Sequence, residues 1–180
     1  MTLIGIISAD SLLNYPDFRA YERSFQLLSQ VAGRAGRRDK PGKVVIQAFD
    51  IQHRVIDQVI RNDYDELFKT EVTERSNFKY SPFYRMIQLD VKHKDFQQLN
   101  YIAERIAVEL RSAFGERILG PEFPLVGRIR NFYIKTIMIK VERSGISIQK
   151  VKQSLSDILL RCEIDKNNKG IILRVDVDPY

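Results

Sequence analysis

The chain has 180 residues, of which 44% are hydrophobic and 29% are charged, and its formal net charge is +6. These values are typical of an ordinary soluble globular protein, and no apolar run approaches the roughly 18 to 20 residues of a membrane-spanning helix. The single cysteine, Cys162, excludes an internal disulfide, and no Cys/His cluster has zinc-site spacing. We therefore expect a cytoplasmic protein, and the positive charge is compatible with a polyanionic partner.

The sequence lacks the loop with which many proteins cradle nucleotide phosphates. No G-x-x-x-x-G-K-[S/T] segment occurs, and no acidic pair lies in a D-E-x-H context that would hold magnesium. We therefore expect the chain by itself to be unable to hydrolyse ATP.

Residues 1–50 predict a strand, a helix and a second strand. Leu3 to Ser8 and Lys43 to Phe49 are short apolar, β-branched runs typical of buried parallel strands. Between them, Pro16 and Asp17 are suited to begin a helix. Apolar residues then recur every three or four positions, at Phe18, Tyr21, Phe25, Leu28 and Ala32. The β-α-β order predicts part of an open α/β sheet, at whose carboxyl edge ligands gather.

Residues 51–80 predict two helices, His53 to Asn62 and Tyr64 to Phe78, which would connect the first part of the chain to the last. The segment Tyr80-Ser81-Pro82 ends the second helix, because a residue before proline avoids the helical conformation. We therefore place the main boundary near Ser81. The expected divisions are 1–50, a helical connector over 51–80, and a C-terminal domain over 81–180.

Residues 81–180 follow the order strand, helix, strand, strand, helix, strand. The strands are expected at Phe83 to Lys92, Ile118 to Phe123, Arg128 to Val141 and Ile171 to Val177, and the helices at Phe96 to Phe114 and Ser147 to Leu160. Alternation predicts inward faces made of Ile87, Leu89 and Val91, of Ile137, Ile139 and Val141, and of Ile171, Leu173, Val175 and Val177. This order predicts a split β-α-β, ferredoxin-like sandwich, so the expected fold class is α/β with an α+β C-terminal domain.

The most informative stretch is Gln30-Val31-Ala32-Gly33-Arg34-Ala35-Gly36-Arg37, directly after the first predicted helix. Arginine suits bidentate contact with phosphate oxygens and stays charged at physiological pH. Glycine lets a chain turn tightly and lets another group come close. Arg34 and Arg37 are therefore candidate anion contacts. The alternative is an ordinary helix C-terminus, with Gly33 as its cap and basic side chains near the negative end of the helix dipole.

The spacing Q-x-x-G-R-x-G-R resembles motif VI of the superfamily 2 helicases, and its flanks narrow the resemblance. Upstream are Ser8 to Leu13 (SADSLL) and Pro16 to Arg23 (PDFRAYER), and downstream are Leu119-Gly120-Pro121 and Val175 to Pro179 (VDVDP). In this order the motifs resemble the PriA family of replication restart (primosomal) DNA helicases over nearly the whole chain. They would correspond to the C-terminal quarter of such a protein, with the end of its second RecA-like lobe in residues 1–50.

The resemblance implies roles for particular residues. Arg34 and Arg37 would reach across a cleft to the ATP phosphates, and Gln30 would orient near the same phosphates or the attacking water. Gly33 would belong to the same turn. Asp10 would lie in the segment that links ATP contacts to DNA contacts, and its alternative role is that of a cap or turn residue.

The resemblance also implies an activity, partners and cofactors. The activity is ATP-dependent unwinding of DNA in the 3′ to 5′ direction, with reloading of the replisome at stalled forks. The implied partners are DNA, single-stranded DNA-binding protein and other primosome proteins, without a membrane. ATP, magnesium and zinc are the implied cofactors. The phosphate-cradling loop and the zinc-binding cysteines of the family have no match here, and the resemblance places them upstream of Met1.

A second candidate surface is the run from Arg128 to Lys135 (RIRNFYIK), where basic and aromatic residues are interleaved. Between Arg117 and Arg143, six basic residues outnumber two acidic ones. Aromatic rings stack on bases and cations track phosphates, so this run is a candidate surface for single-stranded DNA. A solvated strand face is the alternative. The candidate contacts are Arg128, Arg130, Tyr133 and Lys135.

Neighbouring residues in this run point to opposite faces of the predicted strand. We therefore expect only one of Phe132 and Tyr133 to contact DNA and the other to contribute to stability. The PriA family usually has an arginine directly after the tyrosine, where this chain has Ile134. Lys135 carries the nearest charge, on the opposite face from Ile134.

Two other classes of function remain open: a free-standing nucleic-acid-binding module without catalysis, and a protein-interaction scaffold whose basic surface takes an acidic tail. No metal site is expected, because His53 and His93 are isolated in the sequence. Asp176 and Asp178 alternate along the last strand, where solvent exposure or an ion pair is the expected role.

Overall fold

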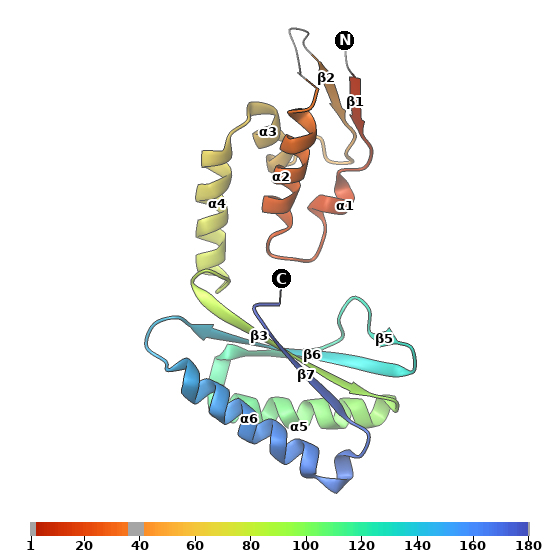
Figure 1. The fold of residues 1–180 in the computed structure, drawn as a ribbon, viewed down its shortest axis with the longest axis vertical. Helices are drawn as coiled ribbons and strands as arrows, with labels where there is room; N and C mark the ends of the chain where they lie inside the picture. The colour runs from red at the N-terminus through yellow and green to blue at the C-terminus, as the bar shows by residue number, and fades with distance from the viewer. Residues whose placement is uncertain (1–2, 36–41, 180) are drawn as a thin grey trace. The chain divides into compact units, whose positions relative to one another are not determined.

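The structure of the protein is a computed structural model that describes residues 3–35 and 42–179. The chain divides into two compact units, Met1–Phe78 and Lys79–Tyr180 (Figure 1). Each unit has a buried apolar cluster of its own. Among the residues described, no helix is both long and apolar enough to cross a membrane.

The first unit contains a pair of short parallel strands, β1 (Leu3–Ile6) and β2 (Lys43–Ile46), which pair in register from end to end. The described residues add the helices α1 (Asp10–Leu13), α2 (Ala20–Ala32), α3 (Arg54–Arg61) and α4 (Tyr64–Asn77). The β-α-β order predicted for residues 1–50 is present, with each strand ending two or three residues earlier than predicted. The core of this unit consists of Ala9, Leu13, Phe25, Leu28, Val55, Ile56, Val59 and Leu67.

Helix α2 begins at Ala20, two residues later than predicted, because Asp17 holds the preceding turn in place. The Asp17 carboxylate accepts hydrogen bonds from the Arg19 backbone N–H at 2.9 Å and from the Arg23 guanidinium at 2.5 Å. The Asp17 side chain is only 2% exposed, so these donors compensate its burial. The single-turn helix α1 was not predicted, since four residues carry no periodic pattern.

The segment 51–80, predicted as a helical connector, belongs to the first unit as far as residue 78. Helices α3 and α4 both contribute to the core of that unit. Side chains cap both helices at their starts: His53 accepts from the Val55 N–H at 3.3 Å, and Asp63 accepts from the Glu66 N–H at 3.0 Å.

The second unit is an antiparallel sheet covered on one face by two helices (Figure 1). The strands β3 (Tyr84–His93), β4 (Ile118–Glu122), β6 (Phe132–Glu142) and β7 (Ile172–Val177) lie in the order β4-β6-β3-β7, and the short β5 (Arg128–Ile129) pairs with β6. The covering helices are α5 (Phe96–Phe114) and α6 (Ile148–Ile164). The connections and strand order are those of the predicted ferredoxin-like sandwich.

The predicted alternation of β3 and β6 is confirmed by burial. The inward residues of these strands, together with the apolar stripe of α5, form the main core of the unit. These inward strand residues are Ile87, Leu89, Val91, Ile137, Ile139 and Val141, each at most 1% exposed.

Two predictions for this unit were wrong in detail. The strand predicted over Arg128 to Val141 is a hairpin, because the chain turns at Arg130, whose φ of 54° is left-handed. Val175 and Val177 are 42% and 49% exposed, although their positions opposite Leu89 and Ile87 place them on the inward face. Strand β7 lies at the edge of the sheet, where the helices cover its end incompletely.

Candidate functional site

The turn after helix α2 carries the predicted anion contacts. The Gly33 N–H donates to the Ser29 carbonyl at 2.9 Å, and the Arg34 N–H donates to the Val31 carbonyl at 3.1 Å. The second bond spans three residues rather than four, which tightens the end of the helix. Ala35, which follows, is 4% exposed and anchors the turn in the unit.

Gly33 does not have the left-handed conformation of a glycine cap. Its φ of −63° and ψ of −15° are right-handed helical values. A Cβ built on Gly33 would lie 3.4 Å from the Ser29 carbonyl oxygen, a van der Waals contact. Neither the conformation nor a close contact within the described chain therefore requires glycine at this position.

The side chains of Gln30 and Arg34 are exposed on this turn. Within residues 3–35 and 42–179, neither side chain forms a hydrogen bond or an ion pair. An exposed guanidinium without a carboxylate partner keeps its full capacity to bind an anion. Gly36 and Arg37, which complete the motif, lie outside the described residues.

Asp10 links the carboxyl ends of the two parallel strands. It begins helix α1 after the three residues that follow β1, and its two carboxylate oxygens accept from the Phe49 backbone N–H at 2.9 and 3.1 Å. Phe49 follows β2, and its side chain is 99% exposed. Asp10 therefore holds the backbone of the segment after β2 in place, at the edge of the sheet where ligands bind in α/β folds.

The basic and aromatic residues of the second unit meet on the β5–β6 hairpin. Arg128 and Tyr133 are a cross-strand pair, and the Arg128 guanidinium carbon lies 4.7 Å from the centroid of the Tyr133 ring. Arg130 occupies the left-handed turn position and is exposed. Cation–π attraction of this kind fixes an arginine while leaving its N–H groups available to an anion.

Two further rings extend this surface. Phe96, at the start of α5, and Phe123, after β4, stack in parallel with their centroids 5.7 Å apart. The Phe96 and Tyr133 centroids are 5.4 Å apart in an edge-to-face arrangement. The Lys135 Nζ atom lies 5.0 Å from the Phe123 centroid. We call this set the cation–aromatic surface: Phe96, Phe123, Arg128, Tyr133 and Lys135.

Sequence reasoning missed Phe96 and Phe123 as members of this surface. Phe96 was predicted as the first residue of a helix and Phe123 as the last residue of a strand; they are 46% and 47% exposed. Phe96 follows the cap residue Asp95, so it lies at the end of the helix beyond the core. That end position is the signal that could have identified it.

The run of basic residues predicted as one surface is divided in the structure. Arg117 donates to Glu142 at 2.7 Å, and this hydrogen bond raises the pKa of Arg117 and lowers that of Glu142. The Lys140 Nζ atom lies 3.7 Å from the centroid of the Tyr80 ring, and burial lowers the Lys140 pKa. Both cations come from the end of the unit remote from the hairpin turn, so the hairpin carries its own cluster.

Phe132 and Tyr133 have different surroundings, as their alternation predicts. Tyr133 is half-buried and packs against the main core, whereas the Lys94 Nζ atom lies 5.5 Å from the Phe132 centroid. Ile134, where the resemblance leads us to expect an arginine, is 4% exposed. The position after the tyrosine is therefore interior in this chain, and Lys135 carries the charge beside the aromatic cluster.

The described part of the chain has no group of three or more His, Cys, Asp or Glu side chains that could hold a metal ion. Asp178 accepts from the Met86 N–H at 3.1 Å, and Asp176 lies 3.8 Å from an Arg174 nitrogen. Burial raises the pKa of the Cys162 thiol to about 11, so its reactive thiolate form is scarce at neutral pH.

The fold and these two sites define a mixed α/β protein in which an arginine-bearing turn precedes a ferredoxin-like unit. The model of the primosomal protein N C-terminal domain family matches residues 76–180. The replication restart proteins PriA of Bacillus subtilis and of Synechocystis are each 34% identical to the chain, over 100% and 99% of its length. The PriA of Chlamydia pneumoniae is 46% identical over 49% of the chain.

The chain therefore belongs to the primosomal protein N (PriA) C-terminal domain family. It covers 22% and 21% of the length of the Bacillus subtilis and Synechocystis proteins, and 12% of the Chlamydia pneumoniae protein.

Proposed function

We propose that the chain is part of an ATP-dependent DNA helicase that acts in replication restart. The observation that carries this proposal is the similarity to replication restart proteins along essentially the whole chain, which includes both the arginine turn and the ferredoxin-like unit. Replication restart requires contact with DNA at forks, so DNA and other primosome proteins, including single-stranded DNA-binding protein, are the proposed partners. The proposed compartment is the cytoplasm.

In this proposal the first unit contributes to ATP hydrolysis. Arg34 is an exposed cation with no partner among the described side chains, and Gln30 lies one helical turn before it. With Arg37, they would contact the phosphates of ATP held by another part of the protein. Cations placed there stabilise the charge of the transferring phosphoryl group. Because Gly33 has a right-handed conformation, its backbone does not require a glycine. In this proposal glycine is needed there because it lets another molecule come close.

The chain supplies only this part of a nucleotide site. It has no phosphate-cradling loop and no acidic pair for magnesium, so ATP and magnesium would be bound by residues outside it. The zinc of the resembled family does not fit the described residues, because no three or more of their His, Cys, Asp or Glu side chains form a group that could hold a metal ion.

The second unit, in this proposal, binds single-stranded DNA through the cation–aromatic surface. Arg128, Arg130 and Lys135 would contact phosphates, and the exposed rings of Phe96 and Phe123 would take bases. The aromatic cluster and its cations lie on one end of a folded unit, which fixes their geometry before DNA arrives.

The decisive experiment expresses the complete reading frame that contains this chain and measures DNA-stimulated phosphate release. We expect ATP hydrolysis, together with unwinding of a partial duplex in the 3′ to 5′ direction. The 180-residue chain alone, purified to homogeneity, serves as the control and should release no phosphate. A complete protein that binds DNA without hydrolysing ATP would instead be a non-catalytic nucleic-acid-binding module. Binding of an acidic peptide but no DNA would indicate an interaction scaffold.

A further inference from the structure

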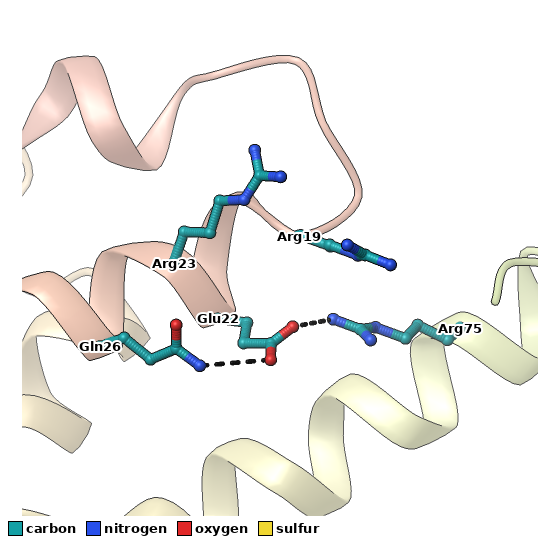
Figure 2. Close-up of a pocket in the computed structure, with 5 residues that line it drawn as sticks. All are labelled: Arg19, Glu22, Arg23, Gln26 and Arg75. Carbon is teal, nitrogen blue, oxygen red and sulfur yellow. Dashed lines mark hydrogen bonds and ion pairs between the residues drawn. The ribbon is translucent and has the colours of Figure 1, made fainter. Parts of the chain in front are cut away.

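A second cluster of arginines lines a pocket of about 380 Å³ in the first unit. Its lining residues are Arg19, Glu22, Arg23, Gln26 and Arg75 (Figure 2). Arg19 directly precedes helix α2, and Glu22, Arg23 and Gln26 lie in its first seven residues, away from the turn that carries Arg34. Arg75 reaches in from α4. All five side chains are polar and three are permanently cationic, so the pocket suits an anion rather than an apolar ligand.

The ring of Phe18 holds two of these arginines near each other. The guanidinium carbons of Arg19 and Arg75 lie 5.3 and 5.2 Å from its centroid. Cation–π attraction to the shared ring offsets part of the repulsion between the two like charges. A negative ligand between them would relieve the remaining repulsion.

Carboxylates at the pocket hold two of its arginines in place. Glu22 accepts from Arg75 at 2.7 Å and from Gln26 at 3.3 Å, as the dashed lines of Figure 2 show. Asp17 is engaged with Arg23 at 2.5 Å and is buried beneath the loop.

Glu71, on the α4 side, is a second carboxylate partner of Arg75. Its oxygen lies 3.4 Å from an Arg75 nitrogen, and burial raises the Glu71 pKa. The buried Nε atom of Arg75 has no hydrogen-bond partner among the residues that the structure describes. The donors of Arg75 are therefore incompletely satisfied by the protein itself.

We propose that this pocket binds a phosphate group, carried either by a nucleic-acid strand or by a small phosphate compound. A phosphate presents more acceptor oxygens than a carboxylate and therefore matches three guanidinium forks better. The start of the 13-residue helix α2 adds the positive end of its dipole. No residue of this site belongs to the Arg34 turn or to the cation–aromatic surface, so the proposal does not depend on the function proposed for either.

The test follows the side-chain N–H signals of arginine by nuclear magnetic resonance in the full chain. Pyrophosphate and an abasic oligonucleotide, which has phosphates but no bases, are titrated in separate experiments. The oligonucleotide series uses a chain with Arg128→Ala and Arg130→Ala, which removes the hairpin cations. We expect saturable shifts of the Arg19 and Arg75 signals. The ligand that saturates the Arg19 and Arg75 signals at the lower concentration of phosphate groups identifies whether the pocket binds a nucleic-acid strand or a small phosphate compound.

Variants separate a ligand site from a structural ion-pair network. Arg19→Gln and Gln26→Glu should each weaken binding about fivefold, since each removes one unit of net positive charge worth on the order of 1 kcal/mol. Glu22→Gln should strengthen binding by a similar factor, because it removes one negative charge and frees Arg75 from the nearer of its two carboxylates. Lys69→Gln and Gln52→Glu make the same charge changes at exposed positions outside the pocket and are the matched controls.

A purely structural network predicts the opposite result for Glu22→Gln, namely loss of stability without tighter binding. The proposal is overturned if neither ligand gives saturable shifts at Arg19 and Arg75. It is also overturned if the folded Glu22→Gln chain binds no more tightly than the unchanged one. The proposal is likewise overturned if the pocket variants and the control variants change the affinity equally, because binding would then depend only on the net charge of the chain.

Discussion

Arg128 lies over the ring of Tyr133, its cross-strand neighbour, with 4.7 Å between the guanidinium carbon and the ring centroid. The same ring meets Phe96 edge to face, 5.4 Å between centroids, and packs against the main core. We propose that Arg128 contacts DNA. Tyr133 therefore connects this arginine to the folded interior of the second unit. Its substitution should affect both stability and binding.

We expect Tyr133→Ala to lower the free energy of unfolding of the second unit by about 2 kcal/mol, because a half-buried ring and an edge-to-face contact are lost. Tyr133→Phe keeps the ring beneath Arg128 and should remain within about 0.5 kcal/mol of the original chain. Urea denaturation followed by circular dichroism gives both values. An unchanged midpoint in Tyr133→Ala would mean that the ring does not support the fold.

The hairpin cations can be tested through the salt dependence of DNA binding. Arg128→Ala combined with Arg130→Ala should reduce the slope of log affinity against log salt by about 1.4 on single-stranded DNA, if each arginine contacts one phosphate. Lys150→Ala with Lys152→Ala removes the same charge from exposed positions of helix α6 and should leave the slope nearly unchanged. Fluorescence anisotropy with a labelled single-stranded oligonucleotide measures the slopes. Equal slopes in both double variants would remove these arginines from the interface.

The fold of the second unit could be predicted because its periodicities are long and uninterrupted. Strand β3 alternates over ten residues, and helix α5 keeps its apolar stripe over nineteen. Burial of Ile87, Leu89 and Val91 follows directly from that alternation. The Arg130 turn could not be predicted in the same way, because an arginine in a left-handed conformation has no signature in the sequence.

The candidate sites were only partly accessible to sequence reasoning. Arg34 was identified by motif spacing, and the structure adds that its side chain has no partner among the described residues. The pocket at Arg19 and Arg75 was not predicted, because these residues lie 56 positions apart, and only the packing of α4 near Phe18 brings them together. Contacts over such separations depend on tertiary packing.

The ion pair between Arg54 and Glu74 predicts a pH dependence of the first unit. The guanidinium donates to both carboxylate oxygens, at 2.6 and 2.8 Å, and this hydrogen bonding lowers the Glu74 pKa from its ordinary value of 4.5. The stabilisation is therefore complete above that ordinary pKa and is lost as the pH falls below it toward the depressed folded-state pKa. Both side chains are 39% exposed, so solvent screening limits the contribution to about 0.5 kcal/mol.

Glu74→Gln should therefore reduce the stability of helices α3 and α4 at pH 7 and leave it nearly unchanged at pH 3. Amide hydrogen exchange in the two helices, corrected for the intrinsic exchange rate at each pH, gives the local free energies of opening. Asp65→Asn changes an exposed acid on the same helix and is the control. An equal loss at both pH values in Glu74→Gln would attribute the effect to packing rather than to charge.

Arg34 offers the sharpest test of the proposed catalytic role, because its side chain makes no contact that its removal would break within the described residues. In the complete protein, Arg34→Ala should lower the rate of DNA-stimulated ATP hydrolysis by about 10³-fold or more, as for other arginines that stabilise a transferring phosphoryl group. Arg34→Lys should recover only part of the rate, since an ammonium keeps the charge but loses the planar fork. Lys69→Ala, which removes an exposed charge from α4 of the same unit, is the control and should keep the original rate. DNA affinity measured at the same salt concentration should not change in any of the three variants, and near-normal hydrolysis in Arg34→Ala would show that this arginine does not act on ATP.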